Sequence, residues 1–316
     1  MRTRESGAPL RARRAERHSL RSGLRMPRVL RQCRAKVGLT LTLLVLAAVV
    51  LGPFVAPYSA TEIVGKPFGG PNADSWLGTD LVGRDVLSRF LMGGRAILIM
   101  SLAATAVGIV TGIAAGLVAA YCKGWVDEAI MRFLDVVLSF PQLVLGLLFV
   151  SIVGPKLWLI ALVIGFSHTP RVARVVRACA LSVIEQDFVL LAETWGVSRI
   201  RILVGEVLPN IGGPTLVELG LRLIFSISLV SGMSFFGFGV QPPRADWGVM
   251  INENRPGLAI APLPVLVPIL AIAVLSVGIN LLTDALSNSS RGRAGSSVDE
   301  SSTATQDEQV PHATDS

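Results

Sequence analysis

The stretch AILIMSLAATAVGIVTGIAAGLVAAY, from Ala96 to Tyr121, contains no charged residue. A helix needs about 20 apolar residues to cross the roughly 30 Å of hydrocarbon in a bilayer, and this stretch is long enough. The composition agrees, because 51% of the residues are hydrophobic, only 16% are charged, and the mean hydropathy is +0.60. Soluble domains carry more charge than this. The sequence therefore predicts an integral membrane protein.

Five further stretches are long and apolar enough for membrane helices. We therefore predict an all-α integral membrane fold with six transmembrane helices. The predicted spans run approximately over Val37 to Val55, Ala96 to Tyr121, Val136 to Val153, Leu157 to Val176, Pro214 to Val240 and Leu258 to Leu282.

The same pattern divides the chain into four parts. They are a basic tail over residues 1–36, a first span and outward loop over 37–95, a core of five spans over 96–286 that contains a polar loop at 187–210, and a second tail over 287–316. Both tails are predicted to be disordered, since the first is dominated by arginine and the second is rich in Ser, Thr and Asp and poor in aliphatic residues.

The second span carries Gly108, Gly112 and Gly116 at intervals of four residues, so all three lie on one face of the helix. In lipid, small residues on one face let helix backbones approach closely. We therefore expect this span to pack tightly inside the bundle.

The basic residues predict the orientation, because short cytoplasmic loops carry an excess of Lys and Arg. The tail of residues 1–36 is rich in arginine, with only Glu5 and Glu16 as acidic residues. The loop after the fourth span is also basic, and its arginines are Arg171, Arg174, Arg177, Arg199 and Arg201. With six spans, both termini and this loop lie on the cytoplasmic side, and the two indications agree.

An arginine-rich start before an apolar run is also typical of a secretory signal or an organelle transit peptide. The five later spans would anchor the chain in a membrane whether or not the first is cleaved. We therefore interpret the start as a cytoplasmic tail that can also contact anionic lipid.

The stretch DFVLLAETWGVSRIRILVGEVLPN, from Asp187 to Asn210, is polar and interrupts the membrane spans. Asp187 is a favourable N-cap for a first helix, and Gly196 suits the position where that helix must stop. Ser198 caps a second helix, which Pro209 ends or kinks because proline lacks an amide N–H. The sequence predicts two short helices that project from the bilayer as a docking surface.

The sequence contains no phosphate-binding loop, no H-E-x-x-H metal motif and no G-x-S-x-G nucleophile elbow. His168, near the inner end of the fourth span, has no Cys or His at ligand spacing and is interpreted as an interfacial polar residue. Glu218 and Arg222 are spaced i, i+4 and are expected to pair with each other. We therefore expect no catalytic residue, no metal, no cofactor and no nucleic-acid partner.

The polar loop resembles the cytoplasmic coupling loop of permeases in ATP-binding-cassette (ABC) importers. Gly196 and the pair Leu208-Pro209 have the spacing of that family's motif. Two positions depart from it, because Leu190-Leu191-Ala192 stands in place of the usual Glu-Ala-Ala and Glu206 occupies the place of an isoleucine.

Four further stretches resemble the dipeptide, oligopeptide and nickel group of these permeases, and within it the second, C-type subunit. They are WLGTDLVGRDVLSRFLMGGR at Trp76 to Arg95, GWVDEAIMRFLDVVLSFPQL at Gly124 to Leu143, FFGFGVQPPRADWGVMINENR at Phe235 to Arg255 and NLLTDAL at Asn280 to Leu286. They stand in the family's order, and the resemblance covers most of the chain from Trp76 to Leu286.

The resemblance implies a subunit without enzymatic activity of its own in a bacterial cell membrane. Two permease subunits, here a heterodimer, form the pathway in this family, two separate ATPase subunits bind from the cytoplasm, and an extracytoplasmic binding protein delivers the solute. A peptide importer is the main expectation. Import of nickel or another small solute, and a membrane scaffold without transport activity, remain alternatives.

Three sets of candidate residues follow. The residues expected to couple to the ATPase are Phe188, Val189, Ala192 and Trp195 as an apolar face, together with Gly196, Arg199, Leu208 and Pro209. The pathway candidates on the fifth span are Ser226, Ser231 and Ser234. The outer-face candidates are Asp80, Arg84 and Asp85 as a charge network and Asp246, Trp247 and Arg255 as contacts for a binding protein, with local structural pairing as the alternative for all six.

Overall fold

The computed structural model describes the backbone of residues 33–307 and the side chains of residues 33–287. The described chain is helical, with only two isolated β-bridges near residues 63–85. The long helices are α3 (Cys33–Val55), α4 (Val86–Cys122), α5 (Gly124–Leu138), α6 (Gln142–Val153), α7 (Leu157–Ile184), α11 (Gly212–Phe235) and α13 (Leu263–Asp307). The short ones are α8 (Asp187–Thr194), α9 (Arg199–Ile202), the π-helix η1 (Leu203–Val207), α10 (Leu208–Asn210), α12 (Trp247–Asn254) and the 3-10 turn η2 (Arg255–Gly257).

Five helices, α3, α4, α7, α11 and α13, are each long and apolar enough to cross a membrane. The remaining predicted span, the third along the chain, corresponds to a bent pair of helices, because α5 and α6 meet at an angle of 81°. Pro141 stands at the N-cap of α6, where it has no amide N–H to continue the ladder of α5. The prediction of six spans is therefore confirmed for five helices, and the third predicted span, Val136 to Val153, is broken near its start, between Leu138 and Gln142.

Several predicted boundaries move. Helix α4 begins at Val86 rather than Ala96, and α7 ends at Ile184 rather than Val176. α11 ends at Phe235 rather than near Val240, because the chain turns through Gly237, whose φ is +83°. α13 is helical to Asp307, past the point where the sequence predicts a disordered tail. Adding residues to an existing helix requires no new nucleation, so a helix can extend beyond its apolar part. The tail residues 1–32 and 308–316 lie outside the described residues.

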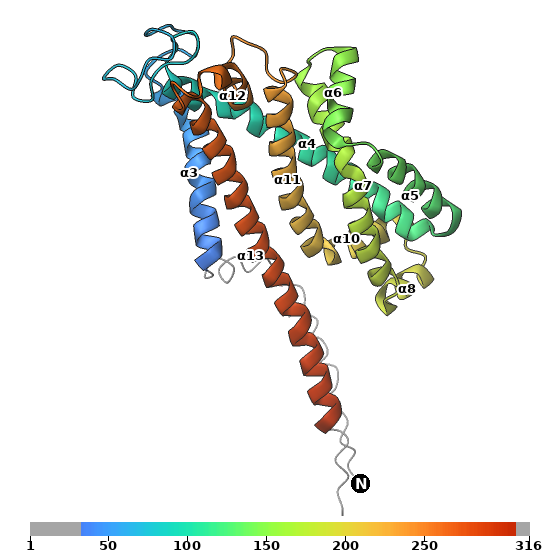
Figure 1. Cartoon of the computed structure of the whole chain (residues 1–316). Coiled ribbons are helices and arrows are strands. Elements are labelled where there is room, and N and C mark those ends of the chain that lie inside the picture. The colour runs from blue at the N-terminus through green and yellow to red at the C-terminus, as the bar shows by residue number, and fades with distance from the viewer. Residues whose placement is uncertain (1–32, 308–316) are drawn as a thin grey trace, which may run out of the picture.

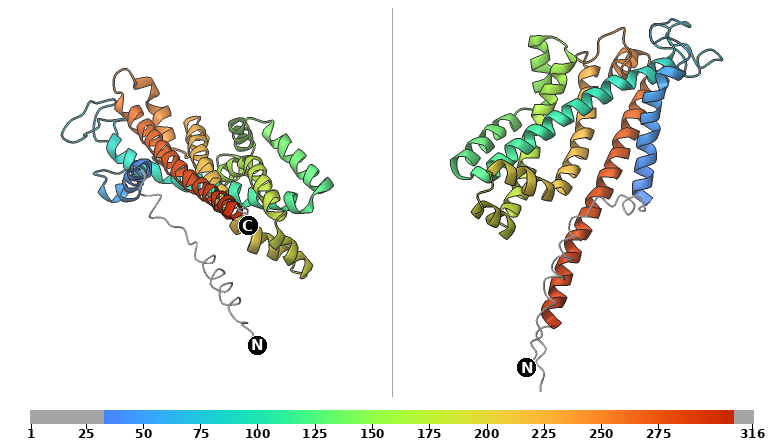
Figure 2. Two further views of the ribbon diagram at one scale, coloured as in Figure 1. Left: turned by 90° about the horizontal axis from the view of Figure 1, so that it is seen from below. Right: turned by 180° about the vertical axis from the view of Figure 1, so that it is seen from behind.

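The candidate residues of the outer face and of the polar loop lie on segments at opposite ends of the bundle (Figures 1 and 2). The residues between α3 and α4, together with α12, lie at one end. The start of α3, the segment α8 to α10 and the C-terminal half of α13 lie toward the other end. We call the first the outer end and the second the inner end.

The most extensive helix contact joins α4 and α7, and glycine makes it possible. A Cβ at Gly108 would lie 2.8 Å from the carbonyl oxygen of Gly165, and one at Gly112 would lie 2.5 Å from Cβ of Val172. At Gly116 it would lie 2.6 Å from the carbonyl oxygen of Ala173. The glycine face predicted from the sequence is therefore the seam on which α7 packs.

We expect Gly112→Leu to destabilise the bundle, because the added side chain overlaps Val172 and the packed interior resists extra volume. The cost should be about 1–3 kcal/mol, measured as a lower unfolding temperature of the protein in detergent. Gly205→Leu is the control, since no atom lies within 4 Å of a Cβ placed there. Equal shifts for the two variants would contradict the packing account.

Candidate functional site

The segment Asp187–Asn210 forms a helical hairpin at the inner end. Helix α8 ends at Thr194, and the chain turns away two residues later at Gly196, whose φ of +74° is favourable only for glycine. The amide of Val197 donates to the carbonyl of Ala192 at 3.1 Å, and the amide of Gly196 donates to that of Glu193 at 3.0 Å. These two bonds make the Schellman motif that satisfies the last carbonyls of a helix. The predicted stop at Gly196 is confirmed.

The starts of the two short helices differ in part from the prediction. Asp187 is the first residue of α8 rather than its cap, and the capping position belongs to Gln186, whose side chain makes no capping bond. Ser198 does stand at the N-cap of α9, but its side chain makes no capping bond there either. Pro209 does not end the second helix, because the π-helix η1 comes just before it and the chain continues to Ile211. A π-turn shifts the hydrogen-bonding register, which accommodates a residue without an amide N–H.

Helix α8 has a buried side and an exposed side, and the predicted apolar face divides between them. Val189 is fully buried and Ala192 is partly buried, packed on the inner ends of α4 and α7. Phe188, Leu191 and Trp195 are exposed, and Trp195 is 81% exposed. The last three are spaced i, i+3, i+7 and share one face of a helix.

The exposed stripe is therefore Phe188, Leu191 and Trp195. Val189 is wrong as a surface residue, and Ala192 lies at the edge of the stripe, partly buried. Amphipathic spacing in the sequence could not decide between the two sides, because both are apolar. Val189 faces inward because it belongs to a cluster of buried apolar side chains that also contains Val183, Ile184 and Ile202. Exposed apolar stripes of this kind are typical of sites that a partner covers.

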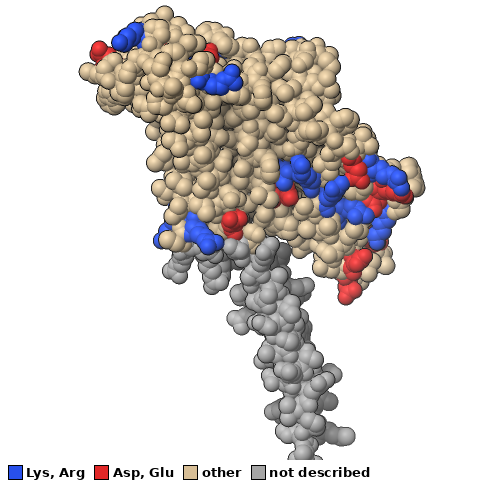
Figure 3. Space-filling view, in the orientation of Figure 1, with Lys and Arg blue, Asp and Glu red and all other residues tan. Residues whose placement is uncertain are grey.

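Polar contacts tie the hairpin to the inner end of α4. The hydroxyl of Tyr121 donates to a carboxylate oxygen of Glu193 at 2.7 Å, and the guanidinium of Arg199 lies 5.6 Å from the centre of the Tyr121 ring. Nearby, Arg177 pairs with Asp127 and Arg174 with Asp135, joining α7 to α5. Figure 3 shows charged groups of both signs gathered at this end.

The three serines proposed for the pathway are buried inside the chain. Ser226 Oγ lies 3.0 Å from Thr105 Oγ1 and 3.1 Å from Nε2 of His168, so it links α11 to α4 and α7. His168 is fully buried rather than interfacial, which the sequence prediction missed. Its position follows from α7, which extends eight residues beyond the predicted end of that span, to Ile184. The pathway role of the serines stays a prediction.

The predicted charge network at the outer end exists in part, because Asp80 and Arg84 form a buried network but Asp85 does not belong to it. Asp80 accepts hydrogen bonds from Nε of Arg84 at 2.7 Å and from Nη1 of Arg89 at 2.5 Å. Both arginines also donate to Glu253, at 2.9 and 3.0 Å. The network joins the loop before α4 to α12. Sequence reasoning missed Arg89 and Glu253, although an arginine in the first turns of an apolar helix was a signal for Arg89.

The remaining outer-face candidates mostly support local structure. Asp85 caps α4, since its carboxylate accepts from the amide of Ser88 at 2.8 Å. Asp246 caps α12 and is fully buried, and burial raises the pKa of its carboxyl to about 6. Trp247 is also buried, with its indole N–H donating to the carbonyl of Phe90 at 2.9 Å. Only Arg255 is exposed.

Asp246 and Trp247 therefore have the local structural role that was the alternative reading, and neither can contact a binding protein directly. A capping aspartate and a buried tryptophan look the same in sequence as exposed recognition residues. The packing of α12 on α4 distinguishes them.

A family model described as "Binding-protein-dependent transport system inner membrane component" matches residues 108–292. This range covers the glycine seam, the hairpin of α8 to α10 and the spans α7, α11 and α13. The chain belongs to this permease family. It is thus an integral membrane component of a transport system, as the resemblance implied.

Curated relatives agree over most of the chain. It is 34% identical to the glutathione transport system permease protein GsiD of Pectobacterium atrosepticum, over 82% of this chain and 87% of that one. It is 31% identical to the dipeptide transport system permease protein DppC of Alkalihalophilus pseudofirmus, over 80% of this chain and 83% of that one. GsiD of Escherichia coli O157:H7 is 33% identical, over 81% and 85%. The permease is therefore similar to these proteins beyond the family domain.

We expect Asp80→Asn to destabilise the permease strongly, because two arginines then stay at the outer end with only Glu253 as an acceptor. Removing one partner of a buried ion pair costs about 3–5 kcal/mol, measured by thermal unfolding in detergent. The control is Glu128→Gln, whose pair with Arg132 is exposed and contributes about 0–1 kcal/mol. Similar stability of the two variants would contradict a structural role for the network.

Proposed function

We propose that this permease forms one half of the solute pathway in an ATP-driven importer of short peptides. The observation that carries the proposal is the hairpin of α8 to α10, which presents the exposed stripe of Phe188, Leu191 and Trp195 at the inner end while its other side is fixed to the bundle. An apolar helix face of this kind fits a groove on a partner protein.

The arrangement suits transmission of force. Helix α8 contacts the bundle through Val189 and through the bond from Tyr121 to Glu193, so a movement of the hairpin displaces the inner end of α4. Helix α4 is 37 residues long and reaches the outer ion network through Arg89. Rigid helices pass such a displacement to the far end of a bundle and can switch access to a pathway between its two sides.

The partners in this proposal are a second permease subunit of different sequence, two ATPase subunits that bind the permease pair from the cytoplasm, and an extracytoplasmic solute-binding protein. The stripe is the contact of this chain with the ATPase. No enzymatic activity is assigned to the chain itself. The inner end faces the cytoplasm of a bacterium, so both termini are cytoplasmic and the chain lies in the inner membrane. Arg171, Arg174 and Arg177 at the inner end support this orientation.

Short peptides are proposed as the solute because the relatives named above are permeases of glutathione and dipeptide transport systems. Nickel or another small solute is the alternative, along with a scaffold that transports nothing.

The decisive experiment is uptake by a strain that lacks the gene, with and without a plasmid copy. We expect loss of uptake of labelled dipeptides, oligopeptides or glutathione in the deletion and recovery with the plasmid. A defect in nickel uptake alone would replace the peptide assignment, and normal uptake of every solute would favour the scaffold.

We expect Trp195→Ala to weaken coupling strongly, because the most exposed side chain of the stripe is removed. Uptake should fall at least about tenfold, as expected when a central aromatic contact of an interface is lost, and less ATPase should copurify with the permease. Trp125→Ala is the matched control, since Trp125 is 78% exposed and follows the inner end of α4 outside the hairpin. A Trp195 variant with full uptake and normal ATPase binding would contradict the docking model.

A further inference from the structure

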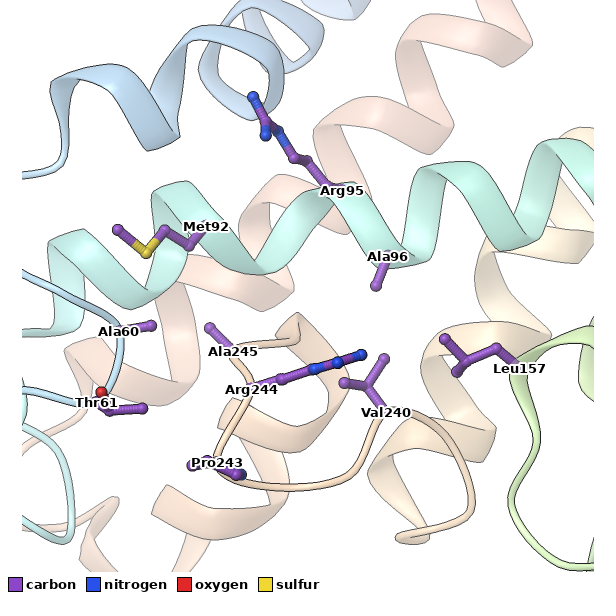
Figure 4. Close-up of a pocket in the computed structure, with 10 residues that line it drawn as sticks. All are labelled: Ala60, Thr61, Met92, Arg95, Ala96, Leu157, Val240, Pro243, Arg244 and Ala245. Atoms are coloured by element: carbon purple, nitrogen blue, oxygen red, sulfur yellow. The ribbon is translucent and has the colours of Figure 1, made fainter.

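A cavity of about 360 Å³ opens at the outer end, away from the hairpin. It lies between the stretch at residues 60–61, the first turns of α4, the start of α7 and the loop from Val240 to Ala245 (Figure 4). The volume is within the range of small-molecule sites, which runs from about 300 to 1,000 Å³. Its position is the one where a solute released outside the membrane would first meet the permease.

The walls of the cavity are mostly apolar, and their only charges are positive. The lining residues are Ala60, Thr61, Met92, Arg95, Ala96, Leu157, Val240, Pro243, Arg244 and Ala245. Two arginines and no acidic residue are among them. The cavity therefore combines an apolar surface with a preference for negative charge.

The guanidinium of Arg95 already has partners within the protein. Its Nη2 donates to the carbonyl oxygen of Val50 at 2.9 Å, and its guanidinium lies 5.5 Å from the centre of the Phe54 ring. In Figure 4 its head points toward α3 and away from the other lining residues. Both contacts lie in the last two turns of α3, where the helix dipole favours a positive charge. Arg95 thus holds α3 and is not free to bind a ligand.

Arg244 is free. Its side chain is exposed and makes no hydrogen bond or ion pair with any described residue of the chain. In Figure 4 it extends across the cavity toward Val240 and Leu157. The nearest acid in sequence, Asp246, is turned inward as the cap of α12, where it accepts from the amide of Gly248 at 2.9 Å.

The loop that carries Arg244 is held at both ends. On one side, the side-chain Nε2 of Gln241 donates to the carbonyls of Gly237 and Gly239, both at 3.0 Å. On the other side, Trp247 is buried under α4. The backbone that carries Arg244 is thus fixed, and the planar fork of a guanidinium matches a carboxylate through two parallel hydrogen bonds.

We propose that this cavity is an entry subsite for the C-terminal residue of a short peptide, with the carboxylate on Arg244 and the last side chain against Ala96, Leu157 and Val240. A free dipeptide has this chemistry, since its carboxylate is adjacent to a side chain of variable size. The assignment rests on the proposed function and adds a specificity-determining residue to it.

The first test compares free-acid and amidated peptides in uptake by the complete transporter, with Ala-Phe and Ala-Phe amide as probes. Arg244→Gln should lower kcat/KM for Ala-Phe about ten- to hundredfold, the factor that corresponds to losing a hydrogen-bonded charge. It should change the value for the amide less than about twofold, because the amide has no negative charge to lose. The binding protein is the same in every strain, so its own preference cancels in the ratio of variant to wild type.

Lys66→Gln is the matched control, since it removes one positive charge from the outer end without lining the cavity. It should leave both probes unchanged. An equal loss for the acid and the amide in Arg244→Gln would overturn the subsite. A loss that depends on the content of anionic phospholipid in proteoliposomes, and not on the peptide carboxylate, would overturn it in favour of a lipid site.

A second variant tests the apolar wall with free-acid peptides alone. Ala96→Leu fills the space beside Arg244, so it should lower kcat/KM for Ala-Phe at least about tenfold more than for Ala-Gly. Equal effects on the two peptides would contradict the placement of the last side chain. If the wild type imports no peptide, the proposed function fails. If it does and the Arg244 and Ala96 variants show no selectivity, only the subsite fails.

Discussion

The contact between α4 and α7 is the constraint on which the rest of the structure depends. Gly108, Gly112 and Gly165 bring the two backbones together, because any side chain at these positions would meet a carbonyl oxygen or a β-carbon of the other helix. In lipid there is little hydrophobic gain from helix association, so close packing has to supply the attraction. The seam makes α4 a rigid element, with the ion network at its outer end and Tyr121 at its inner end.

Buried polar groups then orient the other helices around this pair. Thr105 on α4, His168 on α7 and Ser226 on α11 meet in one hydrogen-bonded cluster, and Gln142 at the start of α6 donates to the carbonyl of Ser167. In an apolar interior an unpaired polar group is costly, so each partner restricts the position of the others. The bent pair of α5 and α6 is thereby held to α7 at the break.

Much of the fold could be predicted from the sequence, and the limits of prediction have specific causes. Length and hydropathy indicate the spans because the bilayer sets a minimum length for them, and Gly196 marks the end of α8 because only glycine adopts its φ without strain. The inward turn of Val189 and the burial of Asp246 depend instead on which neighbour each helix meets. Both residues have side chains that are equally compatible with an exposed site.

The sequence by itself determined the membrane class, five of the spans, the glycine seam and the place of the helical hairpin, since each of these depends on local chemistry or on a fixed spacing along one helix. Only the tertiary structure decided that Phe188, Leu191 and Trp195 form the exposed stripe, that Asp80 is neutralised by two arginines and that Arg244 is free above an apolar cavity. Exposure and pairing are set by residues far apart in the chain, and spacing along one helix carries no information about them.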